Sequence, residues 1–158
     1  MKLYLAGPQV FLPDAAAHFD RARSLCAAHG HEALTPLDGT AQGAAAIYAA
    51  NLALIHAADA VLASLDPFRG FEPDSGTVFE VGYATALGKP VIGYVRDARS
   101  LRQRLTPEGN THDADGLQVE DFDLPLNLML AVPCRIVEGA LAEAIAALDT
   151  RHNEEKSA

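Results

Sequence analysis

The sequence has no tryptophan, few other aromatic residues and only two cysteines among its 158 residues. Cys26 and Cys134 lie far apart and form no CxxC pair, which excludes a disulfide-rich secreted scaffold and indicates a reducing compartment. No apolar run approaches the roughly 20 residues of a membrane-spanning helix, and the apolar N-terminal run is too short for a signal sequence. These absences predict a cytoplasmic protein whose core is built from aliphatic side chains.

Positive charge is also scarce, with 12 Lys and Arg against 21 Asp and Glu and a net charge of −9. Sequence-independent nucleic-acid binding needs many cations to neutralise phosphates, and so does binding to an anionic membrane surface. The charge balance therefore excludes nucleic acid and membrane as expected partners.

Several motifs that would indicate a bound cofactor or a nucleophilic serine are missing. There is no GxGxxG, no GxxxxGK[ST] and no GxSxG, and the six histidines are scattered without HExxH spacing. We therefore expect neither a cofactor nor a bound metal.

What the sequence does contain is a regular alternation of apolar runs and helical segments. Strands are expected at 3–6, 32–35, 59–65, 91–95 and 136–137, and helices at 13–29, 43–57, 75–87 and 139–148. This alternation predicts one flavodoxin-like α/β domain over residues 1–150, with a doubly wound, five-stranded parallel sheet and helices on both faces. Residues 151–158 read as a polar, frayed C-terminal tail.

Ligands of such folds bind at the carboxyl ends of the strands. That rule selects the segments 6–11 and 66–76 and the one that follows Val95. Residues 96–125 are charged, rich in Gly and Pro and too long for an ordinary connection, so they form either a lid or an arm that contacts a partner.

The segment 66–82 carries two acidic residues at a loop-to-helix junction. Asp74 or Ser75 can cap the helix, and Glu80 follows among Val78, Phe79 and Val81. Desolvation by such neighbours raises the pKa of a carboxyl group, the helix N-terminus opposes this, and a poorly hydrated carboxylate is a competent nucleophile. The alternative is that Asp74 is only a cap and Glu80 only a dipole partner.

Four further positions each allow a structural and a functional interpretation. Gly7 either ends a strand or lets a ligand approach the backbone, and Tyr4 is either core or a hydrogen-bond donor into the site. Asn51, in an apolar helix, needs a structural partner or a ligand. Asn127 interrupts the apolar run 124–130, which packs on the chain's own core or on another subunit.

Taken together, these stretches resemble the nucleoside 2-deoxyribosyltransferases. The resemblance covers most of the chain in order, and its most specific element is the Asp74-x5-Glu80-x-Gly82 pattern with Asn-Leu-Met downstream. It runs through residues 2–8, 51, 58–61, 66–70, 72–84 and 124–129.

The resemblance implies a role for each matching residue. Glu80 corresponds to the nucleophile that attacks the anomeric carbon of a 2′-deoxynucleoside and forms a covalent deoxyribosyl-enzyme. Asp74 corresponds to the acid that binds the sugar 5′-hydroxyl, Tyr4 to the tyrosine that orients the nucleophile, and Gly7 to a backbone position lining the sugar site.

Other implied roles concern the neighbouring subunit and the base. Asn127 corresponds to an asparagine that a neighbouring subunit contributes to the sugar, accompanied by Met129. Where this sequence has Asn51, related transferases use an aspartate to protonate the leaving base; an amide cannot do so, but it can bind a base edge. The resemblance makes the residues around 37–42 base-contacting, but they diverge from familiar members, so no base preference carries over.

The resemblance implies an enzyme of nucleoside salvage that moves 2-deoxyribose between purine or pyrimidine bases, as a homodimer or larger homo-oligomer. Its ligands would be a 2′-deoxyribonucleoside and a free nucleobase. One alternative is a deoxynucleoside 5′-monophosphate N-glycosidase, which the negative charge of Asp74 disfavours. Arg69 could meet such a phosphate, although an ion pair with Asp66 or Glu72 is the favoured interpretation. Another alternative is a nucleoside-binding protein without catalysis.

Overall fold

The computed structural model describes residues 1–106 and 110–157, and for 151–157 the backbone alone. Its centre is a five-stranded sheet in the order β2-β1-β3-β4-β5 with every neighbouring pair parallel. The strands are β1 (Lys2–Ala6), β2 (Glu32–Leu34), β3 (Ala60–Ser64), β4 (Val91–Val95) and β5 (Arg135–Glu138). The flavodoxin-like fold expected from the sequence is confirmed.

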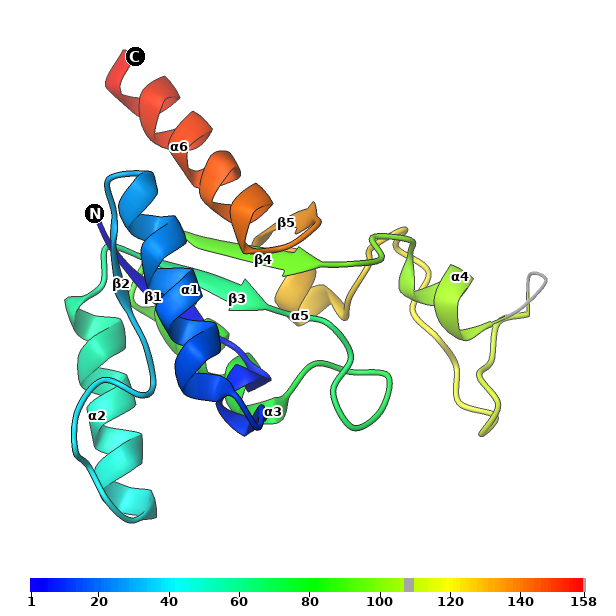
Figure 1. Cartoon of the computed structure of the whole chain (residues 1–158). Helices are drawn as coiled ribbons and strands as arrows, with labels where there is room; N and C mark the ends of the chain where they lie inside the picture. Colours follow the sequence, from blue (N-terminus) through cyan, green and yellow to red (C-terminus); the bar gives the residue numbers. More distant parts are fainter. Residues whose placement is uncertain (107–109, 158) are drawn as a thin grey trace.

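Helices cover both faces of the sheet (Figure 1). One face packs against α1 (Ala15–Ala28) and α6 (Leu141–Ser157), and the other against α2 (Ala44–Ala57), α3 (Ser75–Ala86) and the short α5 (Leu128–Ala131). A single 3-10 turn, η1 (Pro8–Phe11), follows β1 directly. In the part of the chain that the structure describes, no helix combines the length and the apolar character needed to span a membrane.

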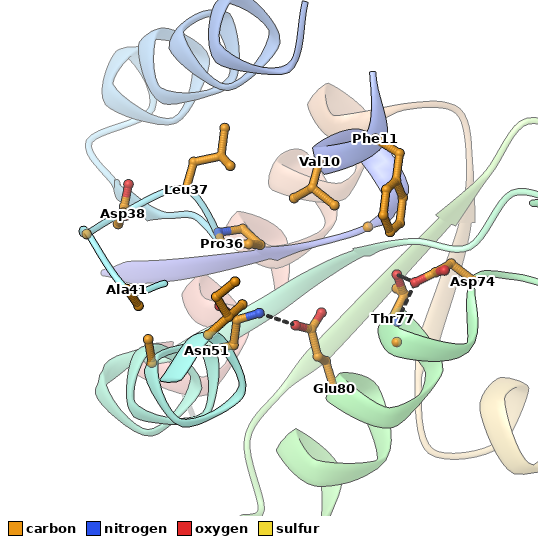
Figure 2. Close-up of a pocket in the computed structure, with 15 residues that line it drawn as sticks. Val10, Phe11, Pro36, Leu37, Asp38, Ala41, Asn51, Asp74, Thr77 and Glu80 are labelled. Carbon is orange, nitrogen blue, oxygen red and sulfur yellow. Dashed lines mark hydrogen bonds between the residues drawn. The ribbon is translucent and has the colours of Figure 1, made fainter. Parts of the chain in front are cut away.

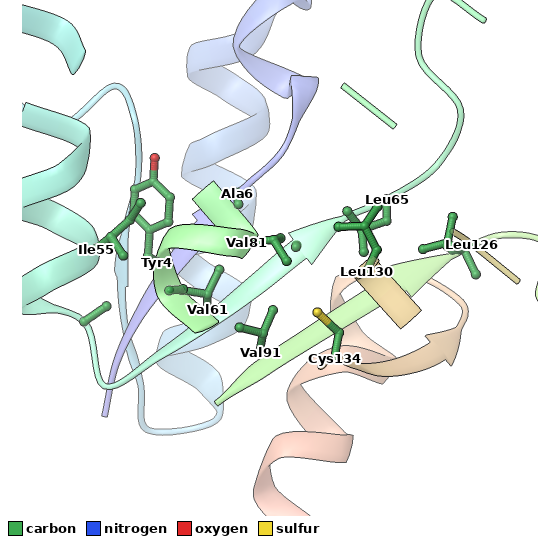
Figure 3. Close-up of a cluster of buried hydrophobic side chains, with 14 of the residues drawn as sticks. Tyr4, Ala6, Ile55, Val61, Leu65, Val81, Val91, Leu126, Leu130 and Cys134 are labelled. Atoms are coloured by element: carbon green, nitrogen blue, oxygen red, sulfur yellow. The ribbon is translucent and has the colours of Figure 1, made fainter. Parts of the chain in front are cut away.

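Side-chain alternation along β1 divides the core into two halves. Leu3 and Leu5 pack toward α1 and α6, whereas Tyr4 and Ala6 join the opposite cluster with Val61 of β3 (Figure 3). Successive side chains of a strand point to opposite faces, so the position of Tyr4 in β1 determines the side of the sheet on which its hydroxyl lies. It lies on the side of α2 and α3.

Two segments contain more regular structure than the sequence pattern predicts. Helix α6 continues to Ser157 instead of ending at residue 148, so the backbone of the expected tail is helical up to that point. The long segment after β4 contains α4 (Leu101–Leu105), which begins with a capping box between Ser100 and Gln103, and an isolated bridge between His112 and Gln118. This segment extends away from the sheet beyond the end of β4 (Figure 1).

Gly93 in β4 offers a direct test of how tightly the sheet is packed. A Cβ at this position would lie 2.6 Å from Leu65 Cδ1 and 2.7 Å from Ile136 Cδ1. We expect Gly93→Ala to lower the free energy of unfolding by about 1–3 kcal/mol, because overpacking forces neighbours off their rotamers. Urea unfolding of the two proteins measures this.

Gly82 provides the matched control for that substitution. It lies in α3, and a Cβ at this position would meet no atom within 4 Å beyond the backbone of its own helix. Gly82→Ala should stabilise the protein by up to about 1 kcal/mol through helix propensity. Equal effects of the two substitutions would contradict the packing argument.

Candidate active site

A cavity of about 510 Å³ opens at the carboxyl ends of β1 and β2 (Figure 2). Its walls are η1, the loop after β2, the first half of α2, and the start of α3 with Glu80. This volume is in the range of small-molecule sites. The segments 6–11 and 66–76 chosen from the sequence do contribute to the cavity, through Gly7, Val10, Phe11, Asp74 and Gly76. Among the described residues, none of the segment after Val95 lines the cavity, whereas the loop after β2 does, through Pro36, Leu37 and Asp38.

Glu80 is the central polar group of the cavity, and two donors meet one of its oxygens. The Tyr4 hydroxyl donates to Glu80 Oε1 at 2.6 Å, and Asn51 Nδ2 donates to the same oxygen at 3.4 Å. Tyr4 is therefore both core and donor, the two roles that the sequence left open. Since both bonds use Oε1, they leave Oε2 available to a ligand.

The surroundings of Glu80 shift its protonation. Burial raises the pKa of Glu80 to about 7, and the negative charge of Asp74 adds to this, whereas the hydrogen bonds from Tyr4 and Asn51 oppose it. Burial and the nearby carboxylate also raise the pKa of Tyr4 far above its usual value, so that its hydroxyl keeps its proton and remains a donor. Near neutral pH Glu80 is poised between acid and carboxylate.

Asp74 combines the two functions that its position suggested. It is the N-cap of α3, with Oδ2 accepting from Thr77 N at 2.9 Å and from Thr77 Oγ1 at 3.1 Å. The residue also lines the cavity, close enough to Glu80 to influence its pKa. Capping fixes the carboxylate at the edge of the cavity and leaves Oδ1 outside these two bonds.

Gly7 is the residue before η1 and lies close to Ser64 of β3. A Cβ there would lie 2.0 Å from Gln9 Oε1 and 2.9 Å from Ser64 Cβ, and Gln9 is itself held by a 2.9 Å bond from Nε2 to Ser64 Oγ. A larger residue would push η1 away from the sheet. Glycine is thus required by packing, and its backbone also lines the cavity.

The end of the cavity away from Asp74 is mostly apolar. Pro36, Leu37, Ile47 and Ala50 line it. The loop that carries Pro36 and Leu37 is fastened to α1 through Asp38 and so forms a fixed wall.

Asp38 fastens that loop. Its carboxylate accepts from Thr35 N at 2.8 Å and pairs with Arg23 at 2.5 Å. Burial acts to raise the pKa of Asp38, but the bonds from Thr35 and Arg23 outweigh it and lower the pKa below its usual value. Asp38 is therefore a carboxylate at neutral pH.

Arg69 is not in the ion pair that the sequence favoured. Asp66 pairs with Arg96 at 3.2 Å instead, and the Arg69 guanidinium lies over the rings of Phe11 and Phe68, at 5.1 and 4.7 Å from their centroids. The two rings stack on each other at 5.5 Å. Because Phe11 lines the cavity, this stack fastens the loop after β3 to one cavity wall.

Asn127 and Met129 lie outside the cavity of their own chain. Asn127 caps α5, accepting from Met129 N at 3.0 Å, and its Nδ2 donates to Glu120 Oε1 at 2.6 Å. Met129 is 74% exposed. Within residues 1–106 and 110–150, where side chains are described, no cluster of His, Cys, Asp and Glu could hold a metal ion.

Fold and site together define a flavodoxin-like α/β protein with a desolvated carboxylate in an open cavity. A family model described as nucleoside 2-deoxyribosyltransferase matches residues 3–129. The chain therefore belongs to the nucleoside 2-deoxyribosyltransferase family.

Three individual proteins are similar to this chain over most of its length. The 2-desoxiribosyltransferase from Leishmania mexicana is 41% identical, with a TM-score of 0.83 over 96% of this chain and 97% of that one. "Uncharacterized protein C191.05c" of Schizosaccharomyces pombe is 31% identical over 168 residues, covering 89% of this chain and 80% of its own length. The CMP N-glycosidase BcmB of Clostridium botulinum, 14% identical, shares the fold with a TM-score of 0.56 over 95% and 99% of the two chains.

The raised pKa of Glu80 predicts a pH-dependent cost in stability. A carboxyl group whose pKa is higher in the folded state stabilises the fold fully below its unfolded pKa of 4.5, and this contribution is lost as the pH rises through about 7. Glu80→Gln removes that titration. The free energy of unfolding of Glu80→Gln minus that of the wild type should therefore increase by about 2 kcal/mol as the pH rises from 5.5 to 8.

Urea unfolding at several pH values measures that difference. Glu72→Gln is the control, because Glu72 is an exposed glutamate in the loop that precedes α3. A difference between wild type and Glu80→Gln that stays constant with pH would show that Glu80 is not desolvated.

Proposed function

We propose that the protein is a nucleoside 2-deoxyribosyltransferase that transfers 2-deoxyribose between nucleobases through a covalent intermediate on Glu80. The observation that carries the proposal is the Glu80 carboxylate, which is held at Oε1 by Tyr4 and Asn51 and free at Oε2 in a cavity of ligand size. A desolvated carboxylate with one fixed and one free oxygen is arranged for nucleophilic attack. Burying the Glu80 carboxylate costs free energy of folding, and a protein that only binds nucleosides would have no need of it.

The reaction runs as two displacements at one carbon. Glu80 Oε2 forms a bond to the anomeric carbon while the glycosidic C–N bond breaks, and the base leaves with that electron pair and takes up a proton. A nitrogen of a second base then attacks the same carbon while the ester C–O bond to Glu80 breaks; this restores the carboxylate, and the incoming base releases its N–H proton to solvent. Two inversions give overall retention. The Tyr4 hydroxyl keeps its proton throughout and holds Oε1.

The charges around the cavity favour an unphosphorylated substrate. Of the described residues that line it, the charged ones are the carboxylic acids Asp38, Asp74 and Glu80. Asp74 Oδ1 is suited to accept a hydrogen bond from the sugar 5′-hydroxyl. A 5′-phosphate in the same place would put two anions in contact, which costs free energy. Arg69, stacked on two rings, lies outside this lining.

Base exchange tests the proposal. Deoxyinosine is incubated with and without adenine and the products are separated by chromatography, with pyrimidine donors and deoxynucleoside monophosphates run in parallel. We expect a deoxynucleoside of the added base only when that base is present. Glu80→Ala should lower the rate by at least about 10³-fold, since no nucleophile remains, and Glu72→Ala should leave it unchanged.

The other outcomes identify the alternatives. Equal base release with and without an acceptor base, greatest from monophosphates, would mean an N-glycosidase. Binding without turnover of any donor would mean a nucleoside-binding protein. Full activity of Glu80→Ala would overturn the assignment of the nucleophile.

We propose further that the active protein is a homo-oligomer in which Asn127 reaches the neighbouring subunit's site. Helix α2 supports this, because it is apolar on nearly every side and yet fully buries only Ile55 within its own chain. A helix that is apolar all round is normally covered. Exposed Ile47 and Tyr48 on α2, Phe79 beside Glu80, and Met129 beside Asn127 extend the uncovered apolar surface.

Mixing two inactive variants tests the shared site. Glu80→Ala lacks the nucleophile and Asn127→Ala lacks the contributed amide, so each homo-oligomer should exchange bases poorly. A hybrid has one site with both residues intact, one from each subunit. Activity should therefore return on dissociation and reassociation of the mixture. Hybrids that form but stay inactive would refute the shared site, and so would a fully active monomer in sedimentation.

A further inference from the structure

Asn51 is a lone polar side chain in the middle of an apolar helix. Its neighbours on α2 are Ala50 and Leu52, and it is only partly exposed. An amide in such surroundings costs free energy unless it is hydrogen-bonded. Figure 2 shows the side chain directed from α2 toward Glu80, and its Nδ2 donates to Glu80 Oε1 at 3.4 Å.

The two donors to Glu80 come from different layers of the fold. Tyr4 reaches Oε1 from the sheet, and Asn51 reaches the same oxygen from α2. One hydrogen bond fixes the distance of a carboxylate but leaves it free to rotate about that bond. A second donor from another direction restricts this rotation and so determines where Oε2 points.

We infer that Asn51 is a positioning residue for the nucleophile, which holds Oε1 together with Tyr4 so that Oε2 faces the anomeric carbon, and that it does not serve the leaving base. This inference rests on the proposed function. The neutral amide stabilises the ionised carboxylate without adding negative charge. An aspartate at this position would instead place another anion beside Glu80, which already experiences the charge of Asp74.

The groups that face Glu80 make this role specific. Tyr4 faces it from β1, Asp74 from the N-terminus of α3, and Asn51 from α2. Asp38, across the cavity, is occupied by Arg23 and Thr35. Asn51 is thus one of two neutral donors in a site whose charged groups are acidic.

Asn51→Asp separates the two roles that this position could have. If the position serves the leaving base, an acid there should accelerate base release. If it positions Glu80, the added charge should raise the Glu80 pKa by about one unit or more and move the rising limb of the pH–rate profile by the same amount. Base release at pH 7 should then fall about fivefold or more, because the ionised fraction of Glu80 falls from about one half to about one tenth. Asn51→Ala, which loses a donor to the ionised form, should raise the same pKa by less.

Two measurements read out these variants. Single-turnover release of the first base across pH gives the kinetic pKa, and ¹³C NMR of the glutamate side-chain carboxyls gives the Glu80 pKa in the folded protein without turnover. Asn110→Asp is the control, since it makes the same chemical change at an exposed residue of the segment after β4. Both of its pKa values should match the wild type.

The outcomes distinguish failure of the inference from failure of the proposed function. Normal exchange by the wild type, with a Glu80 pKa unmoved in Asn51→Asp and Asn51→Ala, would overturn the positioning role and leave the function standing. Faster base release by Asn51→Asp would likewise overturn it in favour of leaving-base protonation. A wild type that turns over no nucleoside refutes the proposed function and, with it, the role in attack; the NMR shift alone would then show only an electrostatic contact.

Discussion

The hydrogen bond between Tyr4 and Glu80 is the interaction on which the rest of the site depends. Tyr4 is fully buried in a central strand, and its hydroxyl needs a partner, which α3 supplies. The bond thereby joins the sheet to a helix and fixes the Glu80 carboxyl group relative to both. It also keeps a carboxylate in surroundings that raise its pKa to about 7. On the proposed function, the stability lost by burying Glu80 would be the counterpart of its reactivity, since groups with perturbed pKa values cluster at active sites.

The parts of the molecule that follow from local patterns could be predicted from the sequence. Apolar runs and helix signals gave the parallel sheet, and the Pro73-Asp74-Ser75 junction indicated the N-cap that fixes Asp74. Contacts between distant segments were harder to foresee. The stack of Arg69 on Phe11 and Phe68 joins two loops that approach only in the folded chain, and charge alone suggested an ion pair instead.

The loop after β2 is not among the segments that the strand-end rule selects, and only the family resemblance marked residues 37–42 as base-contacting. The strand is only three residues long, and the loop is held by an ion pair between Asp38 and Arg23 of α1 that no local pattern indicates. Tyr4, Asn51 and Glu80 could each be selected as candidates from their types and neighbours. Their convergence on one oxygen depends on how α2 and α3 pack across β1, which no local pattern encodes.

The chemistry of a glycosyl-enzyme does not by itself choose between transfer and hydrolysis. Water and a nitrogen base can attack the same carbon, and a protein of the same fold is a CMP N-glycosidase. On the proposed function, the outcome would depend on which nucleophile occupies the cavity while the ester on Glu80 persists. On the proposed function, an apolar wall formed by Leu37, Ile47 and Ala50 would favour a flat base over water. A neighbouring subunit over α2 would enclose the same wall, so that assembly and selectivity for transfer would have a common physical cause.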